Sequence, residues 1–141
     1  MPVPESVLML KFGVVGYGYW GPNIVRNLMT IKEAGLRYVC DQNPKALEKA
    51  KALYPHVQVT SEYDDLINDP DIDAIAIITP VFAHYTLARK ALEAGKHIFI
   101  EKPFTANTKD GRELIELADK NNLIIMVDHT FVFTGAVQKM K

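Results

Sequence analysis

Residues 14–23 read VVGYGYWGPN, an apolar run that leads into three glycines with the spacing G-x-G-x-x-G. In a strand–turn–helix unit the first glycine, Gly16, permits the tight turn, and the second, Gly18, lets the backbone approach a pyrophosphate. The third, Gly21, lets the helix pack close to the strand. Backbone N–H groups and the helix dipole then attract the phosphates. The stretch therefore predicts a dinucleotide-binding turn between a strand and a helix.

Three aromatic residues, Tyr17, Tyr19 and Trp20, lie among these glycines. Their position makes them candidate cofactor-binding residues. Aromatic side chains carry a large apolar surface, so in such a turn they more often pack against their own domain than contact a ligand. Both interpretations stay open at this point.

Apolar runs recur along the chain and alternate with helix-compatible stretches. They predict six strands, at residues 7–15, 36–40, 57–59, 74–79, 97–100 and 123–127. The fourth and sixth runs are almost wholly aliphatic, which is typical of parallel strands buried on both faces. Strands that alternate with helices predict right-handed crossovers. We therefore expect an α/β fold over residues 1–141: a doubly wound Rossmann domain, whose mostly parallel sheet of about six strands carries helices on both faces.

Helix signals lie between these strands. Apolar residues share a helical face in two stretches, Ile24, Leu28 and Ile31 in the first and Ala83, Leu87 and Ala91 in the second. Asn43, which precedes Pro44, predicts an N-cap. Ser61, which stands three residues before Asp64, predicts an imperfect capping box.

Composition limits the function classes. The chain is 48% hydrophobic, and its 16 basic and 17 acidic residues give a net charge of -1, which does not indicate a nucleic-acid or acidic-lipid surface. No apolar run approaches the roughly 18 residues of a membrane helix. The single cysteine, Cys40, excludes an internal disulfide and is interpreted as a small buried hydrophobe rather than a nucleophile. With no signal-peptide pattern in MPVPES, we expect a cytoplasmic protein.

An acidic residue at the end of the second predicted strand adds to the glycine pattern. Asp41 follows Gly21 by 20 positions and comes directly after the apolar YVC. A carboxylate there accepts hydrogen bonds from the adenosine ribose and repels the 2′-phosphate of NADP. No arginine follows in DQNPK to offset that repulsion. Alone, Asp41 would be interpreted as a loop-capping aspartate; with the three glycines it favours NAD over NADP.

A second group of polar residues follows the fourth and fifth predicted strands. Thr79 and Pro80 end the fourth strand, and Glu101, Lys102 and Pro103 end the fifth. Ligands of open parallel sheets bind beyond the carboxyl ends of the strands, so both groups point to the nicotinamide half of a cofactor site. Lys102 is a candidate general acid or base. A surface lysine paired with Glu101 is the equal alternative.

The histidines occupy two kinds of position. His84 lies about one turn into the helix after Thr79, near the expected crevice, and His129 follows the sixth strand. His56 and His97 lie at strand entrances, away from the predicted site. No pair has metal-ligand spacing on a recognisable element, so we predict no metal.

Three stretches together resemble the Gfo/Idh/MocA oxidoreductases: GVVGYGYWGPN, ITPVFAHYTLARKALEAGKHIFIEKPF and VDHTFVF. The resemblance runs from about Lys11 to the C-terminus, and the run from ALEAGKH to EKP is far more specific than the glycine loop. The GYGYWGPN variant and the HTF segment are similar to branch members associated with surface-polysaccharide and sugar-nucleotide metabolism.

The resemblance implies hydride transfer between a carbohydrate carbinol and C4 of NAD. It also implies roles for the residues that match the motifs: the three glycines hold the pyrophosphate, Asp41 the ribose, and Thr79, Pro80 and His84 line the nicotinamide side. Glu101 and Lys102 would lie beside the nicotinamide ring, with Lys102 near the substrate hydroxyl. The peptide between Lys102 and Pro103 can be cis in the family.

Family members continue into a second α+β domain with the substrate pocket, further catalytic residues and usually the oligomer interface. The chain is therefore expected to be the cofactor domain alone, and the full-length protein a homo-oligomer that takes a sugar or sugar nucleotide. Two alternatives remain open. One is a non-catalytic NAD-binding module or redox sensor, and the other is an S-adenosylmethionine-dependent methyltransferase, in which EKP has no obvious purpose.

Overall fold

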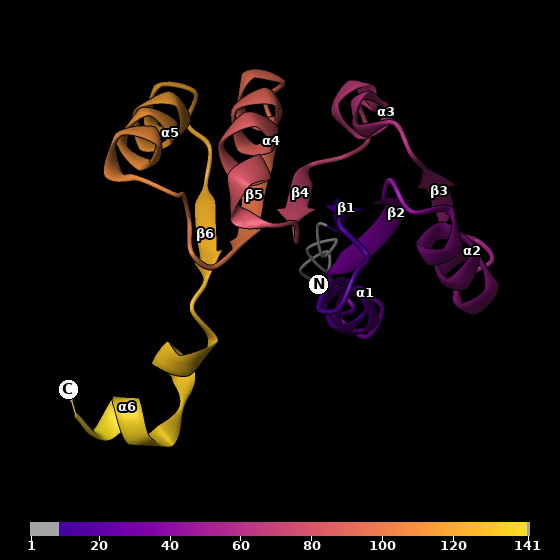
Figure 1. Ribbon diagram of the computed structural model, residues 1–141, viewed down its shortest axis with the longest axis horizontal. Coiled ribbons are helices and arrows are strands. Elements are labelled where there is room, and N and C mark those ends of the chain that lie inside the picture. Colours follow the sequence, from indigo (N-terminus) through magenta and orange to yellow (C-terminus); the bar gives the residue numbers. More distant parts are fainter. Residues whose placement is uncertain (1–8, 141) are drawn as a thin grey trace, which may run out of the picture.

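Six strands form one sheet in the computed structural model, which describes residues 9–140 (Figure 1). The strands are β1 (Leu10–Val15), β2 (Ala34–Cys40), β3 (Gln58–Thr60), β4 (Ala74–Ile77), β5 (His97–Glu101) and β6 (Ile125–Asp128). Their order is β3-β2-β1-β4-β5-β6, and every neighbouring pair is parallel. Strands β2 and β3 thus lie on one side of β1, and β4, β5 and β6 lie on the other. This is the doubly wound Rossmann arrangement, so the predicted fold is confirmed.

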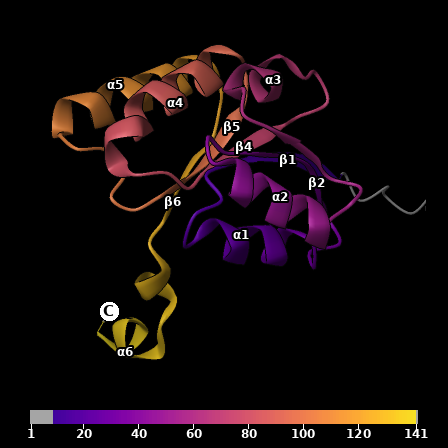
Figure 2. The same ribbon diagram turned by 45° about the vertical axis from the view of Figure 1, so that its right-hand side comes forward.

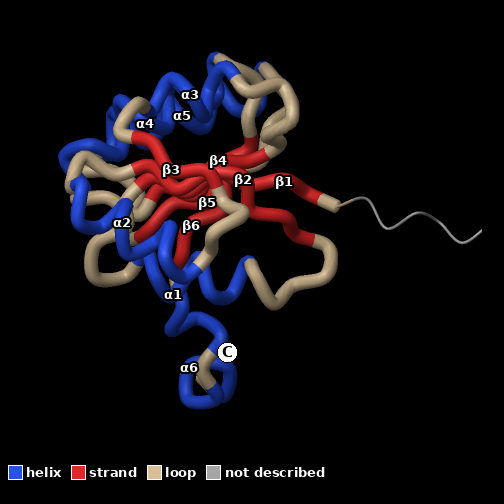
Figure 3. The backbone as a smooth tube through the Cα atoms, turned by 90° about the vertical axis from the view of Figure 1, so that its right-hand side faces the viewer, coloured by secondary structure: helices blue, strands red, loops and turns tan. Residues whose placement is uncertain are grey.

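Helices cover both faces of the sheet, as predicted. They are α1 (Gly21–Leu28), α2 (Pro44–Leu53), α3 (Tyr63–Asn68), α4 (Val81–Glu93) and α5 (Thr108–Lys120). Figures 1 and 3 show α1 and α2 on one face and α3, α4 and α5 on the other. Beyond β6, the short helices η1 (Thr130–Phe133) and α6 (Gly135–Lys139) lie away from the sheet (Figure 2).

The hydrophobic core is divided by the sheet into two clusters. Consecutive strand residues point to opposite faces, so Val14 packs in the cluster with α1 and α2 while Val15 packs in the one with α3, α4 and α5. All four residues of β4 are buried, because this central strand has neighbours on both edges and side chains packed on both faces. The aliphatic run that predicted a buried parallel strand is therefore explained.

Several local predictions differ from the structure. The first strand begins at Leu10, and residues 7 and 8 of its predicted range lie outside the described residues. The shared face of the first helix ends at Leu28, because the helix ends there and Ile31 is 47% exposed beyond it. The capping box at Ser61 is wrong: the Glu62 N–H before α3 donates to Thr60 Oγ1 at 3.0 Å instead. The N-cap at Asn43 is confirmed.

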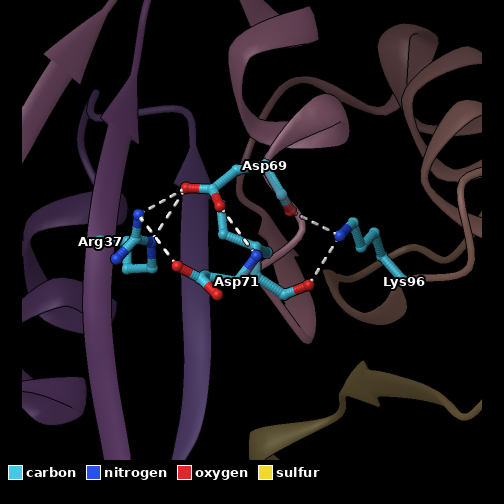
Figure 4. A network of polar contacts seen from close by, with 5 residues as sticks. Arg37, Asp69, Asp71 and Lys96 are labelled. Carbon is cyan, nitrogen blue, oxygen red and sulfur yellow. Dashed lines mark hydrogen bonds and ion pairs between the residues drawn. The ribbon is translucent and has the colours of Figure 1, made fainter.

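A polar network fastens the edge of the sheet opposite the carboxyl ends of β4 and β5 (Figure 4). The buried Lys96 Nζ donates to the carbonyl oxygens of Asp69 and Ile72 at 2.7 and 2.8 Å. Arg37 on β2 donates to the Asp69 carboxylate at 2.9 Å and lies 3.8 Å from the Asp71 carboxylate. These charges join β2, the segment before β4 and the start of β5, so their role is structural.

Among residues 9–140, no helix has both the length and the apolar character needed to cross a membrane.

Candidate functional site

The glycine loop joins β1 to α1, and two of its glycines are required by the protein itself. Gly16 has φ +99°, and a Cβ there would collide with the Ile78 carbonyl oxygen at the end of β4. A Cβ on Gly21 would collide with the carbonyl oxygen of Gly16. A side chain at either position would therefore prevent the sharp turn of the loop and the start of α1 against it.

Gly18 is different, because a Cβ on it would meet no protein atom within 4 Å. Its φ is not in the left-handed region, so neither the backbone nor the packing demands glycine there. The space that a side chain would fill is open in the structure. This open position suits the close approach of a pyrophosphate to the backbone, and the loop therefore fits a dinucleotide.

Asp41 connects the glycine loop to the end of β2. Its Oδ2 accepts a hydrogen bond from the Tyr17 N–H at 2.6 Å, and its Oδ1 accepts one from the Asn43 N–H at 2.7 Å. Each carboxylate oxygen has two lone pairs, so each retains one for a ribose hydroxyl. Asp41 thus caps the loop, and it is also positioned at the strand end where a ribose would bind.

The aromatic residues of the loop have three different environments. Tyr17 is buried with Val25 and Val39 in the core on the α1 face, and burial raises the pKa of its hydroxyl. Its side chain is therefore part of the core, as the packing interpretation expected, and only its backbone faces the loop. Tyr19 is 94% exposed at the loop tip.

Trp20 lines an open groove of about 570 Å³ on the α1 side of the sheet. The groove runs along β4, β5 and β6 and is mainly apolar, with Ile24, Phe99 and Met126 among its lining residues. Asp128 and Thr130 lie at its end beside the carboxyl edge of the sheet. Trp20 therefore belongs to the wall of this groove.

The second group of predicted residues meets at the carboxyl ends of β4, β5 and β6. Ile77 at the end of β4 pairs with Ile100, and Glu101 at the end of β5 pairs with Asp128. Thr79 lies two residues beyond the end of β4, and Lys102 directly follows β5. The parallel register thus brings residues from three distant parts of the sequence to one edge.

Glu101 and Asp128 are adjacent carboxyl groups. Burial raises the pKa of Glu101, and a side-chain hydrogen bond with Asp128 and the charge of Asp128 raise it further, against the opposing effect of Lys102. Within residues 9–140, Glu101 Oε2 is buried without a hydrogen-bond partner. Asp128 Oδ1 accepts from Thr130 Oγ1 at 2.9 Å. The Glu101 carboxyl therefore holds a proton more readily than an isolated glutamate.

Asp128 was missed in the sequence. The signal was present, because Asp128 directly follows the apolar run 123–127, and strand ends were the positions that singled out Thr79 and Lys102. Its partnership with Glu101 depends on the order of the strands, which the sequence pattern does not specify.

Lys102 and Pro103 are exposed, and the peptide between them is cis. His84, in contrast, is 0% exposed, and its ring nitrogens lie 2.9–3.1 Å from backbone carbonyl oxygens of Thr79, Pro103 and Phe104. The ring therefore lies behind the two loops rather than in the crevice, unlike the predicted lining role. Lys102 is exposed at this edge, where its ammonium can reach a ligand.

Two further histidines and the cysteine have different environments. His129 is exposed beyond β6, and His97 Nδ1 accepts from the Ile124 N–H at 3.0 Å. Cys40 is buried, and burial raises the pKa of its thiol to about 12, as suits a core residue. In the described part of the chain, no three His, Cys, Asp or Glu side chains are grouped to hold a metal ion.

Known proteins share this fold and these motifs. Residues 10–129 match the Gfo/Idh/MocA family model, described as an oxidoreductase family with an NAD-binding Rossmann fold. The uncharacterized oxidoreductase YdgJ of Escherichia coli (strain K12) is 38% identical over 120 residues, which cover 85% of this chain and 34% of YdgJ. The solved structure of the putative oxidoreductase yvaA from Bacillus subtilis is 27% identical, with a TM-score of 0.88 over 96% of this chain and 39% of that one.

Two further relatives have stated activities. The UDP-N-acetylglucosamine 3-dehydrogenase of Acidithiobacillus ferrooxidans (strain ATCC 23270) is 30% identical over 96% of this chain and 42% of its own length. The scyllo-inositol 2-dehydrogenase (NADP(+)) IolW of Bacillus subtilis (strain 168) is 29% identical over 89% of this chain and 34% of its own length. The chain thus spans roughly a third to two fifths of the length of these three relatives.

The parallel strand order agrees with the family match, and membership of an oxidoreductase family argues against the methyltransferase alternative. The chain belongs to the Gfo/Idh/MocA oxidoreductases and forms their NAD-binding Rossmann domain.

Proposed function

We propose that this chain is the cofactor domain of an enzyme that transfers a hydride between NAD and a hydroxyl-bearing carbon of a carbohydrate or sugar nucleotide. The observation that carries the proposal is the placement of both predicted half-sites at one edge of the sheet. The glycine loop and Asp41 lie at the ends of β1 and β2, and Thr79 and Lys102 follow β4 and β5. The stated activities of the two dehydrogenase relatives support the substrate class.

Each group has a separate task in this proposal. Backbone N–H groups around Gly18 and the start of α1 bind the pyrophosphate, and Asp41 binds the adenosine ribose. The nicotinamide, when bound, supplies or accepts the hydride. Lys102 Nζ exchanges a proton with the substrate hydroxyl oxygen, since it is exposed at the carboxyl end of β5. Glu101 and Asp128 hold a proton beside it.

The preference for NAD over NADP is part of the proposal. The Asp41 carboxylate would repel a 2′-phosphate, and no arginine follows it in DQNPK. One relative is named as an NADP(+) enzyme, so the preference must be measured on this chain. Calorimetric titration of the 141-residue chain with NAD and with NADP tests it, and tighter binding of NADP would contradict it.

The substrate is expected to bind between this domain and the part of the protein that its relatives have in addition. We therefore expect the 141-residue chain to bind NAD without turning over sugars, because donor and acceptor carbons need near-attack geometry. For the whole protein we also propose a homo-oligomer, which the family resemblance implies, and a cytoplasmic location, which the single cysteine favours.

Turnover is tested by the absorbance of reduced cofactor. A protein that carries this domain at the length of its relatives is assayed with NAD and a panel that includes scyllo-inositol and UDP-N-acetylglucosamine. Reduction of NAD by a member of the panel supports the proposal. NAD binding without reduction by any sugar or sugar nucleotide would instead favour a non-catalytic NAD-binding module or redox sensor.

A further inference from the structure

His84 joins two loops that the proposed reaction uses. It is the fourth residue of α4, and its ring is completely buried. Nε2 lies 2.9 Å from the carbonyl oxygen of Thr79, at the end of β4. On the other side of the ring, Nδ1 lies 3.0 Å from the carbonyl oxygen of Pro103 and 3.1 Å from that of Phe104.

All three oxygens are backbone acceptors, so the ring holds its neighbours only by donating N–H groups. The acceptors on the Nδ1 side directly follow Lys102, and Phe104 itself packs against the core cluster beneath α4 and α5. The acceptor on the Nε2 side belongs to the loop after β4. The imidazole therefore spans the space between the two loops.

We propose that His84 is a positioning residue, whose buried imidazole fastens the loop that carries Lys102 to the carboxyl end of β4. This role rests on the proposed function in one respect only, which is that Lys102 is taken to exchange a proton with the substrate. The connection between the loops is a property of the domain itself. His84 thus acts through Lys102 and does not contact the cofactor or the substrate.

The tautomer of the ring decides which loop receives the hydrogen bond, since a neutral imidazole has a single N–H. Among the described residues, no carboxylate or cation lies in hydrogen-bond or ion-pair contact with His84.

Two variants separate the two sides of the ring. In His84→Asn the amide nitrogen takes a position like that of Nδ1 and can still donate to Pro103 or Phe104. In His84→Gln it takes a position like that of Nε2 and can donate to Thr79. We expect exchange at the Lys102 and Phe104 amides to be about two- to tenfold faster in His84→Gln than in His84→Asn, the effect of one lost hydrogen bond.

The experiment uses the 141-residue chain and NMR-detected hydrogen exchange, with amides of β1 as the internal reference for global stability. Equal loop exchange in the two variants would overturn the proposal. If neither variant folds, the parent chain decides it: the ¹⁵N resonances of His84 must show an N–H on Nδ1, the ring nitrogen that faces Pro103 and Phe104. A ring with its N–H on Nε2 alone would overturn the proposal as well.

Titration of the same samples with NAD keeps this result separate from the proposed function. Asp41 and the glycine loop lie at the other half of the site, so NAD affinity should be close to parental in both variants. A chain that fails to bind NAD would refute the proposed function and leave the exchange result standing.

Discussion

Gly18→Ala should separate the folding of the glycine loop from its binding of a cofactor. A Cβ at this position would meet no protein atom within 4 Å, and the backbone φ is not left-handed. The free energy of unfolding should therefore stay within about 0.5 kcal/mol of the parent, as for other neutral surface changes. The added methyl group would occupy the space in which the pyrophosphate approaches the backbone.

The loss of affinity can be stated from the contacts at risk. Hydrogen bonds to a charged group contribute roughly 1.5–3 kcal/mol, so displacing the phosphate from one backbone N–H should weaken NAD binding about 10- to 100-fold. Calorimetric titration measures the affinity, and thermal unfolding of the same sample measures stability. Gly21→Ala should instead lower stability strongly, because its Cβ would collide with the Gly16 carbonyl oxygen.

Gly135→Ala is the matched control. It adds the same methyl group, also with no protein atom within 4 Å, but it lies at the start of α6, away from the loop. Neither its stability nor its NAD affinity should differ from the parent. Parental NAD binding by Gly18→Ala would refute the assignment of the loop to the pyrophosphate, and unfolding of that variant would refute the claim that the position is open.

Three more outcomes are expected. Asp41→Ala should weaken NAD binding, measured by calorimetry, about 10- to 100-fold. Because Asp41 also accepts a hydrogen bond from the Tyr17 N–H, the substitution should accelerate hydrogen exchange of the Tyr17 amide. An unchanged NAD affinity would exclude a role of Asp41 at the ribose. Lys102→Ala, in a protein of the relatives' length, should lower kcat about 10²- to 10⁴-fold with NAD affinity retained, and near-parental kcat would exclude proton transfer by Lys102. Folding raises the pKa of Glu101 and so favours its protonated form, which adds to the free energy of unfolding fully at and below about pH 4; this addition is lost as the pH rises through the raised pKa. In Asp128→Asn the free energy of unfolding, measured in urea at a series of pH values, should fall less over that range, because the charge of Asp128 no longer raises the pKa of Glu101. An identical pH dependence in both proteins would show that the two carboxyls are not coupled.

Local patterns were sufficient for the class of fold and for the glycine loop. A buried parallel strand must be apolar on both faces, and β4 showed this as an unbroken run of aliphatic residues. The requirement for glycine at Gly16 and Gly21 follows from the tight turn between a strand and a helix, which the spacing alone indicates. The ends of the strands also identified Asp41 and Lys102 as candidates, because each directly follows an apolar run.

The partners of these residues were decided by the tertiary structure. Asp41 accepts from Tyr17, 24 positions earlier, and Glu101 meets Asp128 only because β6 pairs with β5 in this register. His84 shows the same limit: its helical position suggested a crevice residue, yet packing of α4 on the sheet buries the ring against carbonyls 19 and 20 positions away. A sequence pattern records which side chains each strand and helix presents. Which of them meet depends on strand order and helix packing, and these are set by interactions between segments that are distant in the chain.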